Sequence, residues 1–292
     1  MRNFSDYDPF AVSVWFFAVT GMAMFCNYPV LMLISLAGGI LFFLVRNGTK
    51  HAKSHLFFFM LFAVLAIANP IVSHNGMTVL FVVNDSPVTL EAVLYGLNSA
   101  AMIVGVLYWF RSYTQLMTSD KLLSVTGRLS PKISLLLSMA LRCVPMLRRQ
   151  ADRTADAQKA MGLFKDDNII DDIHGNIRVF SAVTTWALEN GITSADSMAA
   201  RGFGTGRRTQ MRKYKLRRSD IIFMAVTIGL LGVCVAAAAH GSFEFGFYPL
   251  TDRICPDTAG KFGIAAYALL VSVPTIIETE AALKWRYLKS KI

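Results

Sequence analysis

The sequence predicts an all-α integral membrane protein, with about six transmembrane helices and two long cytoplasmic helices inserted between the fourth and fifth spans. Composition is the first reason. The 292 residues are 54% hydrophobic with a mean hydropathy of +0.46, and 16% are charged, against about 25% in soluble proteins. The apolar residues also gather in blocks that are long enough to cross a bilayer. Finally, basic residues are concentrated on one set of connections between these blocks.

Residues 1–110 are expected to hold the first four spans. The run 11–45 has no charge and is too long for one helix, because about 20 residues cross the hydrocarbon core. Pro29 disfavours helix at the residue before it, so we expect two short spans joined by a turn at Asn27-Tyr28-Pro29. A third span is expected at 56–72, ended by Asn69-Pro70. The fourth follows at about 89–110, after a polar connection with a short extended piece.

Residues 219–292 are expected to hold spans five and six, at 221–239 and 262–277, and a short basic tail. Connections on one side carry nearly all the basic residues, including the whole of 111–218. The other side carries more acidic than basic residues. Because short loops rich in Lys and Arg stay in the cytoplasm, the basic side and both termini are expected inside.

The insertion 111–218 is expected to form a cytoplasmic region built on two helices. It contains 19 Lys and Arg against 9 Asp and Glu, which equals the net charge of +10 of the whole chain. The first helix is expected to bend at Pro145 and to place Leu147, Ala151 and Ala155 on one face. An acidic connector, 163–176, leads to a second helix at about 177–201. Gly162 and Gly202 follow the two helices and are expected to cap them in the left-handed conformation.

Several short motifs in this region resemble those of the transmembrane coupling component of energy-coupling-factor (ECF) transporters, the CbiQ/EcfT-like family. The resemblance covers about 140–240. It rests on an Ala-Gln-x-Ala-x-Gly pattern, a Ser-Met-x-Ala-Arg-Gly-Phe-Gly pattern, an Arg-Arg-Thr sequence, an Asp at the start of a span and an upstream Arg-x-x-Pro. The matching residues are Ala157, Gln158, Ala160, Gly162, Ser197, Met198, Ala200–Gly204, Arg207–Thr209, Asp220, Arg142 and Pro145.

The resemblance implies a non-catalytic subunit without a cofactor or metal, in the cell membrane of a prokaryote. Its partners would be two ABC-type ATPases, in the form of a heterodimer or of identical subunits, and a substrate-binding membrane subunit. ATPase docking would fall to the helix tips, Ala160, Met161, Gly162, Ala200, Arg201 and Gly202. Support of the coupling helices would fall to Arg142, Pro145, Gln158, Ser197, Met198 and Arg208. The transported compound, a vitamin or a cobalt or nickel ion, stays open.

The resemblance also implies that the two coupling helices cross, and the residue types of the region suit this. Small residues would let the helices cross closely, namely Ala151, Ala155 and Ala160 on the first and Ala195, Ala199 and Ala200 on the second. The guanidinium of Arg201 can bind a carboxylate or carbonyl groups of a partner. The family usually has arginine in the first tip as well, and this chain has Met161, whose flexible side chain fits apolar grooves.

The sequence gives less support to other functions. Asp166, Asp167, Asp171, Asp172 and His174 could bind a cation, but an acidic solvated connector is the simpler interpretation. The basic run 201–218 suits anionic lipid headgroups, and no fold motif supports nucleic-acid binding. No phosphate loop or nucleophile–base pair indicates an enzyme. The alternatives are a permease subunit of another ABC importer and a membrane scaffold without an ATPase partner.

Overall fold

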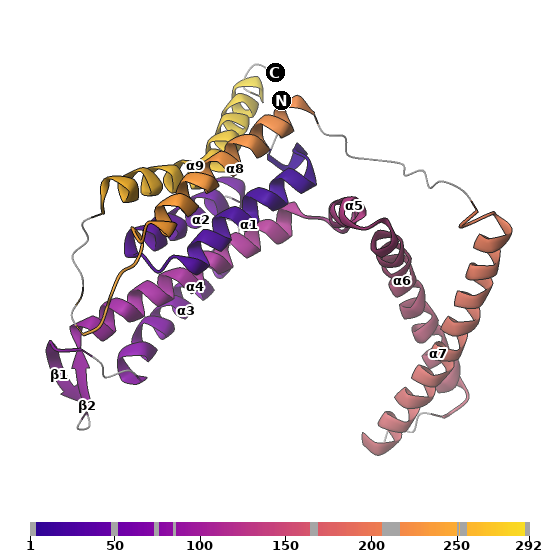
Figure 1. Ribbon diagram of the computed structural model, residues 1–292. Coiled ribbons are helices and arrows are strands. Elements are labelled where there is room, and N and C mark those ends of the chain that lie inside the picture. Colours follow the sequence, from indigo (N-terminus) through magenta and orange to yellow (C-terminus); the bar gives the residue numbers. More distant parts are fainter. Residues whose placement is uncertain are drawn as a thin grey trace. The chain divides into compact units, whose positions relative to one another are not determined.

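The computed structural model describes residues 4–47, 52–72, 76–83, 86–163, 169–205, 217–249, 251 and 256–289. Helices form nearly all of this part of the chain (Figure 1). In chain order the elements are η1 (Phe4–Asp6), α1 (Pro9–Phe25), α2 (Pro29–Asn47), α3 (Ala52–Val72), β1 (Val79–Val83), β2 (Ser86–Thr89), α4 (Leu90–Leu116), α5 (Ser119–Leu129), α6 (Pro131–Ala160), α7 (Ile169–Ala200), α8 (Arg218–Ala239) and α9 (Thr258–Lys289).

The chain divides into two compact units. Unit 1 combines Met1–Leu122 with Tyr214–Ile292, and unit 2 is Leu123–Lys213. Five helices of unit 1, namely α2, α3, α4, α8 and α9, are long and apolar enough to cross a membrane. The all-α membrane fold expected from the sequence is therefore confirmed. Helix α1 is apolar but has only 17 residues, so the count of six spans stays a prediction.

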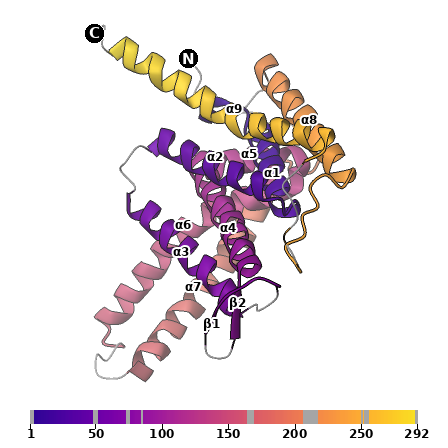
Figure 2. The ribbon, with the colours of Figure 1, turned by 90° about the vertical axis from the view of Figure 1, so that its left-hand side faces the viewer.

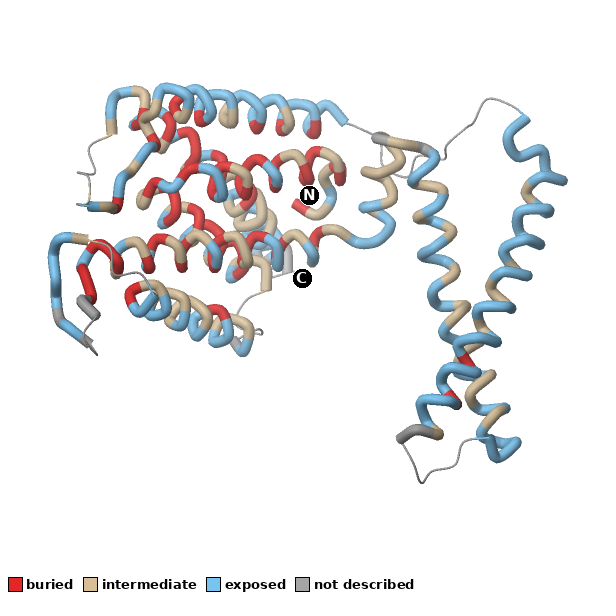
Figure 3. Tube along the Cα trace, turned by 60° about the horizontal axis from the view of Figure 1, so that its bottom comes forward, coloured by how far each residue is buried: buried red, intermediate tan, exposed pale blue. Residues whose placement is uncertain are grey.

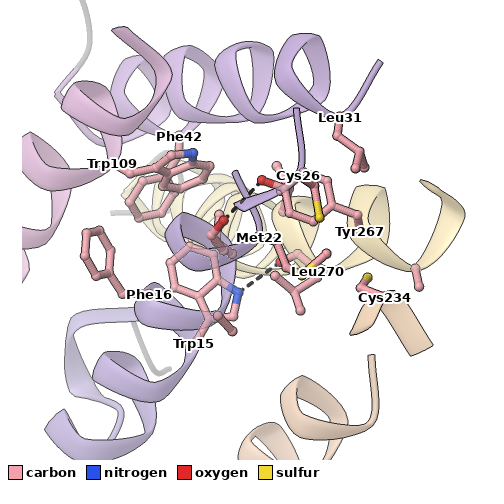
Figure 4. Close-up of a cluster of buried hydrophobic side chains, with 14 of the residues drawn as sticks. Trp15, Phe16, Met22, Cys26, Leu31, Phe42, Trp109, Cys234, Tyr267 and Leu270 are labelled. Carbon is pink, nitrogen blue, oxygen red and sulfur yellow. Dashed lines mark hydrogen bonds between the residues drawn. The ribbon is translucent and has the colours of Figure 1, made fainter. Parts of the chain in front are cut away.

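Helix α1 forms the centre of unit 1 and contacts α2, α4, α8 and α9. Eleven of its residues are buried, among them Trp15, Phe16 and Met22. Their side chains meet Phe42 of α2 and Trp109 of α4 in one aromatic cluster, drawn in Figure 4. The ring centroids of Trp15 and Trp109 lie 5.4 Å apart in an edge-to-face arrangement, a favourable geometry for aromatic pairs.

Three buried hydrogen bonds tie these helices together. The indole N–H of Trp15 donates to the carbonyl of Leu270 over 2.9 Å, and the hydroxyl of Tyr267 donates to the carbonyl of Val19 over 3.2 Å (Figure 4). The indole N–H of Trp109 donates to the carbonyl of Ser35, also over 3.2 Å. Because hydrocarbon offers no water to these donors, each bond removes the cost of an unpaired polar group.

Helix α3 continues through Pro70 to Val72, so the expected end at Asn69-Pro70 is wrong. Proline lacks the N–H that would bind the carbonyl of Ala66. Helix α4, which packs against α3 (Figure 2), places Gly96 beside that carbonyl. A Cβ at Gly96 would lie 2.9 Å from the Ala66 oxygen, so only glycine permits this close approach. Helix α4 thus packs closely over the carbonyl that Pro70 leaves without its helical donor.

The connection between α3 and α4 contains the extended piece that the sequence predicts. Strands β1 and β2 pair antiparallel. Glu91, in the first turn of α4, is 1% exposed and accepts hydrogen bonds from the backbone N–H and the hydroxyl of Thr78. Thr89 caps α4 by accepting from the N–H of Ala92 over 3.3 Å. These bonds anchor the hairpin to the end of the helix.

The helices around and within unit 2 differ from the expected boundaries. Helix α4 extends to Leu116 rather than ending near residue 110. Helix α6 continues as one helix through Pro145. Helix α7 begins at Ile169, eight residues before the expected start, so most of the expected connector is helical. Asp171 and Asp172 lie in its first turn, where carboxylates stabilise a helix by interacting with its dipole.

Candidate functional site: two helix tips in unit 2

Helices α6 and α7 cross, and each carries one partly buried face (Figures 1 and 3). On α6 this face is half-buried and recurs at helical spacing, with Cys143, Met146, Leu147, Gln150, Ala151, Thr154, Ala155 and Gln158. On α7 the corresponding residues are the buried Gly175 and Val179 and the half-buried Val183, Trp186, Ala187 and Asn190. The expected face of Leu147, Ala151 and Ala155 is therefore confirmed.

The expected crossing residues of the second helix are wrong. Ala195, Ala199 and Ala200 are exposed, and so is Ala160 of α6. The buried residues of α7 belong instead to its first half, around Gly175 and Val179. Since α7 starts earlier than the sequence suggested, its crossing point also lies earlier in the chain. The small residues near its end are left accessible.

The first helix tip ends in a Schellman motif. The N–H of Met161 donates to the carbonyl of Ala157 over 3.1 Å, and the N–H of Gly162 donates to the carbonyl of Lys159 over 2.9 Å. The N–H of Leu163 then reaches back to the carbonyl of Gln158 over 3.1 Å. Gly162 has a φ of +69°, which glycine adopts without the strain that a Cβ would cause.

The second helix tip repeats this pattern residue by residue. The N–H of Arg201 donates to the carbonyl of Ser197 over 3.2 Å, and that of Gly202 to Ala199 over 2.9 Å. The N–H of Phe203 donates to the carbonyl of Met198 over 3.0 Å, and Gly202 has a φ of +78°. Both glycines therefore cap their helices as the sequence predicts. The matched geometry places Met161 and Arg201 at equivalent positions.

Both tips present accessible side chains. Met161 is 67% exposed, and Arg201 is exposed, with no hydrogen-bond or ion-pair partner for its guanidinium among the described residues. The residue after each glycine is apolar and accessible as well: Leu163 is 39% exposed and Phe203 is 50% exposed. Each tip thus presents two side chains. The one before the glycine differs between the tips, and the one after the glycine is apolar in both.

Two residues of the first tip were missed by reasoning from the sequence. Leu163 could have been found, because an apolar residue directly after a capping glycine is a known part of the Schellman motif. Arg178 could not, since it reaches the first tip only through the fold. Its guanidinium donates to the carbonyl of Leu163 over 3.2 Å and thereby connects the first tip to α7.

The supporting residues expected from the sequence are dispersed. Gln158 and Met198 hold equivalent places, because each offers its carbonyl to the residue after the capping glycine. Ser197 likewise accepts from the N–H of Arg201. Arg142 and Pro145 are exposed on α6, roughly 25 Å or more along the helix from Met161 at 1.5 Å per residue, so they do not belong to the tip. Arg208 lies outside the described residues.

The described residues offer no arrangement for binding a metal ion. No group of three or more His, Cys, Asp or Glu side chains comes together among them. Of the acidic connector, Asp171 is half-buried, and Asp172 and His174 are exposed on α7. Asp166 and Asp167 lie outside the described residues. Among the described residues, the candidate site of unit 2 is therefore the pair of accessible helix tips, each closed by a Schellman motif.

Comparison with known proteins relates this chain to a protein family. The family model described as CbiQ, cobalt transport protein, matches residues 4–212. The chain is 24% identical over 243 residues to the energy-coupling factor transporter transmembrane protein EcfT of Thermotoga maritima, covering 79% of this chain and 88% of that protein. A match of 29% identity to the EcfT protein of Streptococcus equi subsp. equi covers 37% of this chain and 42% of that protein.

A third relative carries a different name. The chain is 26% identical over 220 residues to a putative ABC transporter ATP-binding protein of Bifidobacterium longum. This match covers 72% of the chain but only 25% of that protein.

Proposed function

The chain belongs to the CbiQ family of cobalt transport proteins and is a multi-pass membrane component of an ECF-type transporter, and we propose that it is the subunit that couples ATP hydrolysis to transport. In this proposal the tips of α6 and α7 dock on two ABC-type ATPases. Unit 1 holds a separate substrate-binding membrane subunit. Closure of the ATPase pair moves the two crossed helices, and they transmit the motion to unit 1.

The observation that carries this proposal is the equivalence of the two tips. Two crossed helices end in the same Schellman motif, and each exposes a side chain at the position just before the glycine. A repeated shape suits a repeated partner, and two ATPases provide one groove for each tip. The relative from Bifidobacterium longum supports an ATPase partner, because a segment similar to this chain occupies about a quarter of a protein named for ATP binding.

The side chains at the two tips differ, and this difference supports an ATPase pair of two distinct subunits. Arg201 offers a planar cation for a carboxylate or for backbone carbonyls, whereas Met161 offers an apolar, adaptable side chain. Identical ATPases would present the same groove to both. We therefore propose a heterodimer, with an acidic or carbonyl-lined groove for Arg201 and an apolar groove for Met161.

The proposal also includes the side of the membrane on which unit 2 lies, the non-catalytic role of the subunit and the class of compound transported. In this proposal unit 2 and both termini lie in the cytoplasm, where ATP is available, and the basic charge of 111–218 supports this orientation. The subunit itself is non-catalytic. The cargo is a vitamin or a transition-metal ion, and the substrate-binding subunit selects it.

Purification of the chain with and without its partners tests the proposal. The tagged chain would be co-expressed with two ABC ATPases and a small hydrophobic substrate binder encoded beside it. We expect the complex to retain both ATPases and to hydrolyse ATP. The chain alone should neither bind nor hydrolyse ATP, and hydrolysis by the pure chain would contradict the proposal. Loss of both ATPases from the complex under mild purification would contradict it as well.

A further inference from the structure

The N-terminal residues Phe4–Tyr7, here called the N-terminal clasp, contact the two stretches of unit 1 that border unit 2. The chain leaves unit 1 after Leu122, in the second turn of α5, and returns at Tyr214, shortly before α8. Contacts of the clasp with the outgoing stretch are polar, and contacts with the returning stretch are aromatic.

On the outgoing side, Lys121 binds the clasp directly. Its ammonium group donates to the carbonyl of Ser5 over 2.6 Å and to the carbonyl of Leu116, in the last turn of α4, over 3.2 Å. Lys121 is half-buried, and this burial, together with the charge of Arg46, lowers the pKa of Lys121, while Asp6 acts in the opposite direction. The bond to Leu116 spans Met117 and Thr118, the non-helical residues between α4 and α5.

On the returning side, the clasp packs against Phe223 in the second turn of α8. Its ring centroid lies 5.9 Å from that of Phe4 and 5.4 Å from that of Tyr7. The first turn of α8 is itself fixed, because the carboxylate of Asp220, which is fully buried, accepts from the N–H of Arg217 over 3.0 Å.

The clasp is anchored to the rest of unit 1 through Glu278 of α9. One carboxylate oxygen accepts from the backbone N–H of Phe4 over 3.1 Å, and the other lies 3.5 Å from the guanidinium of Arg46 in α2. Both charged side chains are largely buried, at 15% and 20% exposure. The ring of Phe4 is fully buried against Trp15 and Phe42. The clasp is therefore part of the core of unit 1.

We propose that the N-terminal clasp, with Lys121 as its positioning residue, is a fixed pivot that holds the beginning of α5, ahead of the coupling helices, to the rest of unit 1. This inference rests on the proposed function. A lever transmits motion only when its attachment does not bend, and the non-helical residues Met117 and Thr118 would otherwise absorb the displacement. Lys121 prevents this bending by holding the beginning of α5 to both the clasp and the end of α4.

The test measures the stiffness of this connection. Spin labels would be attached to cysteines introduced at Leu122 in α5 and Trp285 in α9, both exposed and both in unit 1, after replacement of the native cysteines by alanine. Pulsed electron paramagnetic resonance then gives the distribution of distances between the labels in the complete transporter and in the chain alone. Lys121→Met removes both hydrogen bonds, and Lys121→Arg keeps a donor in place.

We expect Lys121→Met to raise the population with a bent connection about tenfold. A tenfold change corresponds to about 1.4 kcal/mol, and a hydrogen bond to a charged group contributes about this much net free energy. The distance distribution should gain a broad second component, and Lys121→Arg should restore the narrow one. ATPase retention and hydrolysis should be unchanged. A distribution as narrow as that of the parent protein would overturn the inference, and so would broadening that Lys121→Arg does not reverse.

A second pair of variants keeps the inference testable if Lys121→Met fails to fold. Glu278→Gln weakens the buried anchor of the clasp, whereas Glu280→Gln, two residues later, removes an exposed ion pair with Lys284. Only Glu278→Gln should broaden the distribution, and equal effects of the two would overturn the inference. If the parent protein binds no ATPases, the proposed function fails, but the stiffness of the chain alone still decides whether the clasp is a pivot.

Discussion

Met161 and Arg201 occupy the same position at the ends of two different helices. Each donates its backbone N–H to the carbonyl four residues earlier, and each is followed by a glycine with positive φ. The backbone therefore offers two copies of one shape, while the side chains give those copies different chemistry. Substitutions of the glycines therefore change the shape of a tip, and substitutions of Met161 or Arg201 change its chemistry.

Reversing the charge at the second tip should release an ATPase. Arg201→Glu places a carboxylate at the negative end of the helix dipole and against the proposed groove. Losing a buried charged contact typically costs ~2–5 kcal/mol, so co-purification of the ATPases and ATP-dependent transport should both be lost. Arg149→Glu, an equal charge change on the exposed face of α6, is the control and should have little effect.

The first tip should respond to a different set of substitutions. Met161→Ala should weaken the complex less than Arg201→Glu does, because only packing is lost. Met161→Arg should release an ATPase from the proposed apolar groove, because the buried cation would have no partner there, whereas tolerance would indicate a groove like that of other family members. The same co-purification assay measures all these variants. Wild-type transport by Arg201→Glu together with complete loss in Met161→Ala would show that the dominant contact lies at the first tip.

The capping glycines should tolerate substitution less well than a glycine within the helix. A Cβ at Gly162 meets no atom within 4 Å, so the cost of Gly162→Ala, about 1–2 kcal/mol, comes only from the left-handed backbone. Gly191 in α7 is equally uncrowded but helical, and Gly191→Ala should stabilise its helix by about 0.5–1 kcal/mol. Hydrogen exchange at the amide of Leu163 should accelerate only in Gly162→Ala.

Gly96 should be sensitive to substitution, because its crowding atom belongs to the backbone of a neighbouring helix. Gly96→Ala would place a methyl group 2.9 Å from the carbonyl oxygen of Ala66, and relieving such overpacking costs about 1–3 kcal/mol. Gly21 in α1 has no atom within 4 Å of the same position, so Gly21→Ala serves as a matched control. Thermal unfolding in detergent should show a lower Tm for Gly96→Ala alone. An unchanged Tm would mean that α3 and α4 separate easily.

The proposed topology can be tested with single cysteines. Asp172 in α7 and Met77 before β1 are both exposed. In a chain without its native cysteines, a membrane-impermeant reagent should label Met77→Cys from outside intact cells. It should label Asp172→Cys only after lysis. Labelling of Asp172→Cys before lysis would place unit 2 outside the cytoplasm.

The site could be predicted from the sequence to the extent that it depends on local backbone chemistry. Gly162 and Gly202 end their helices because glycine adopts a positive φ at little cost, and that rule needs no knowledge of the fold. The face containing Ala151 and Ala155 follows from helical periodicity in the same way. The crossing residues of α7 did not follow, because the start of that helix was placed too late. Arg178 was missed because its contact with Leu163 joins residues fifteen positions apart.

The sequence by itself determined the class of this protein, since uncharged runs of sufficient length must cross a membrane, and basic connections set the expected orientation. Tertiary structure decided which polar groups within and beside those runs become partners. Trp15 finds the carbonyl of Leu270, and Glu278 binds both Phe4 and Arg46, across more than 230 residues of sequence. Such contacts depend on how helices pack, and hydropathy assigns a residue to a helix without fixing its neighbour. The N-terminal clasp exists for this reason only in the folded chain.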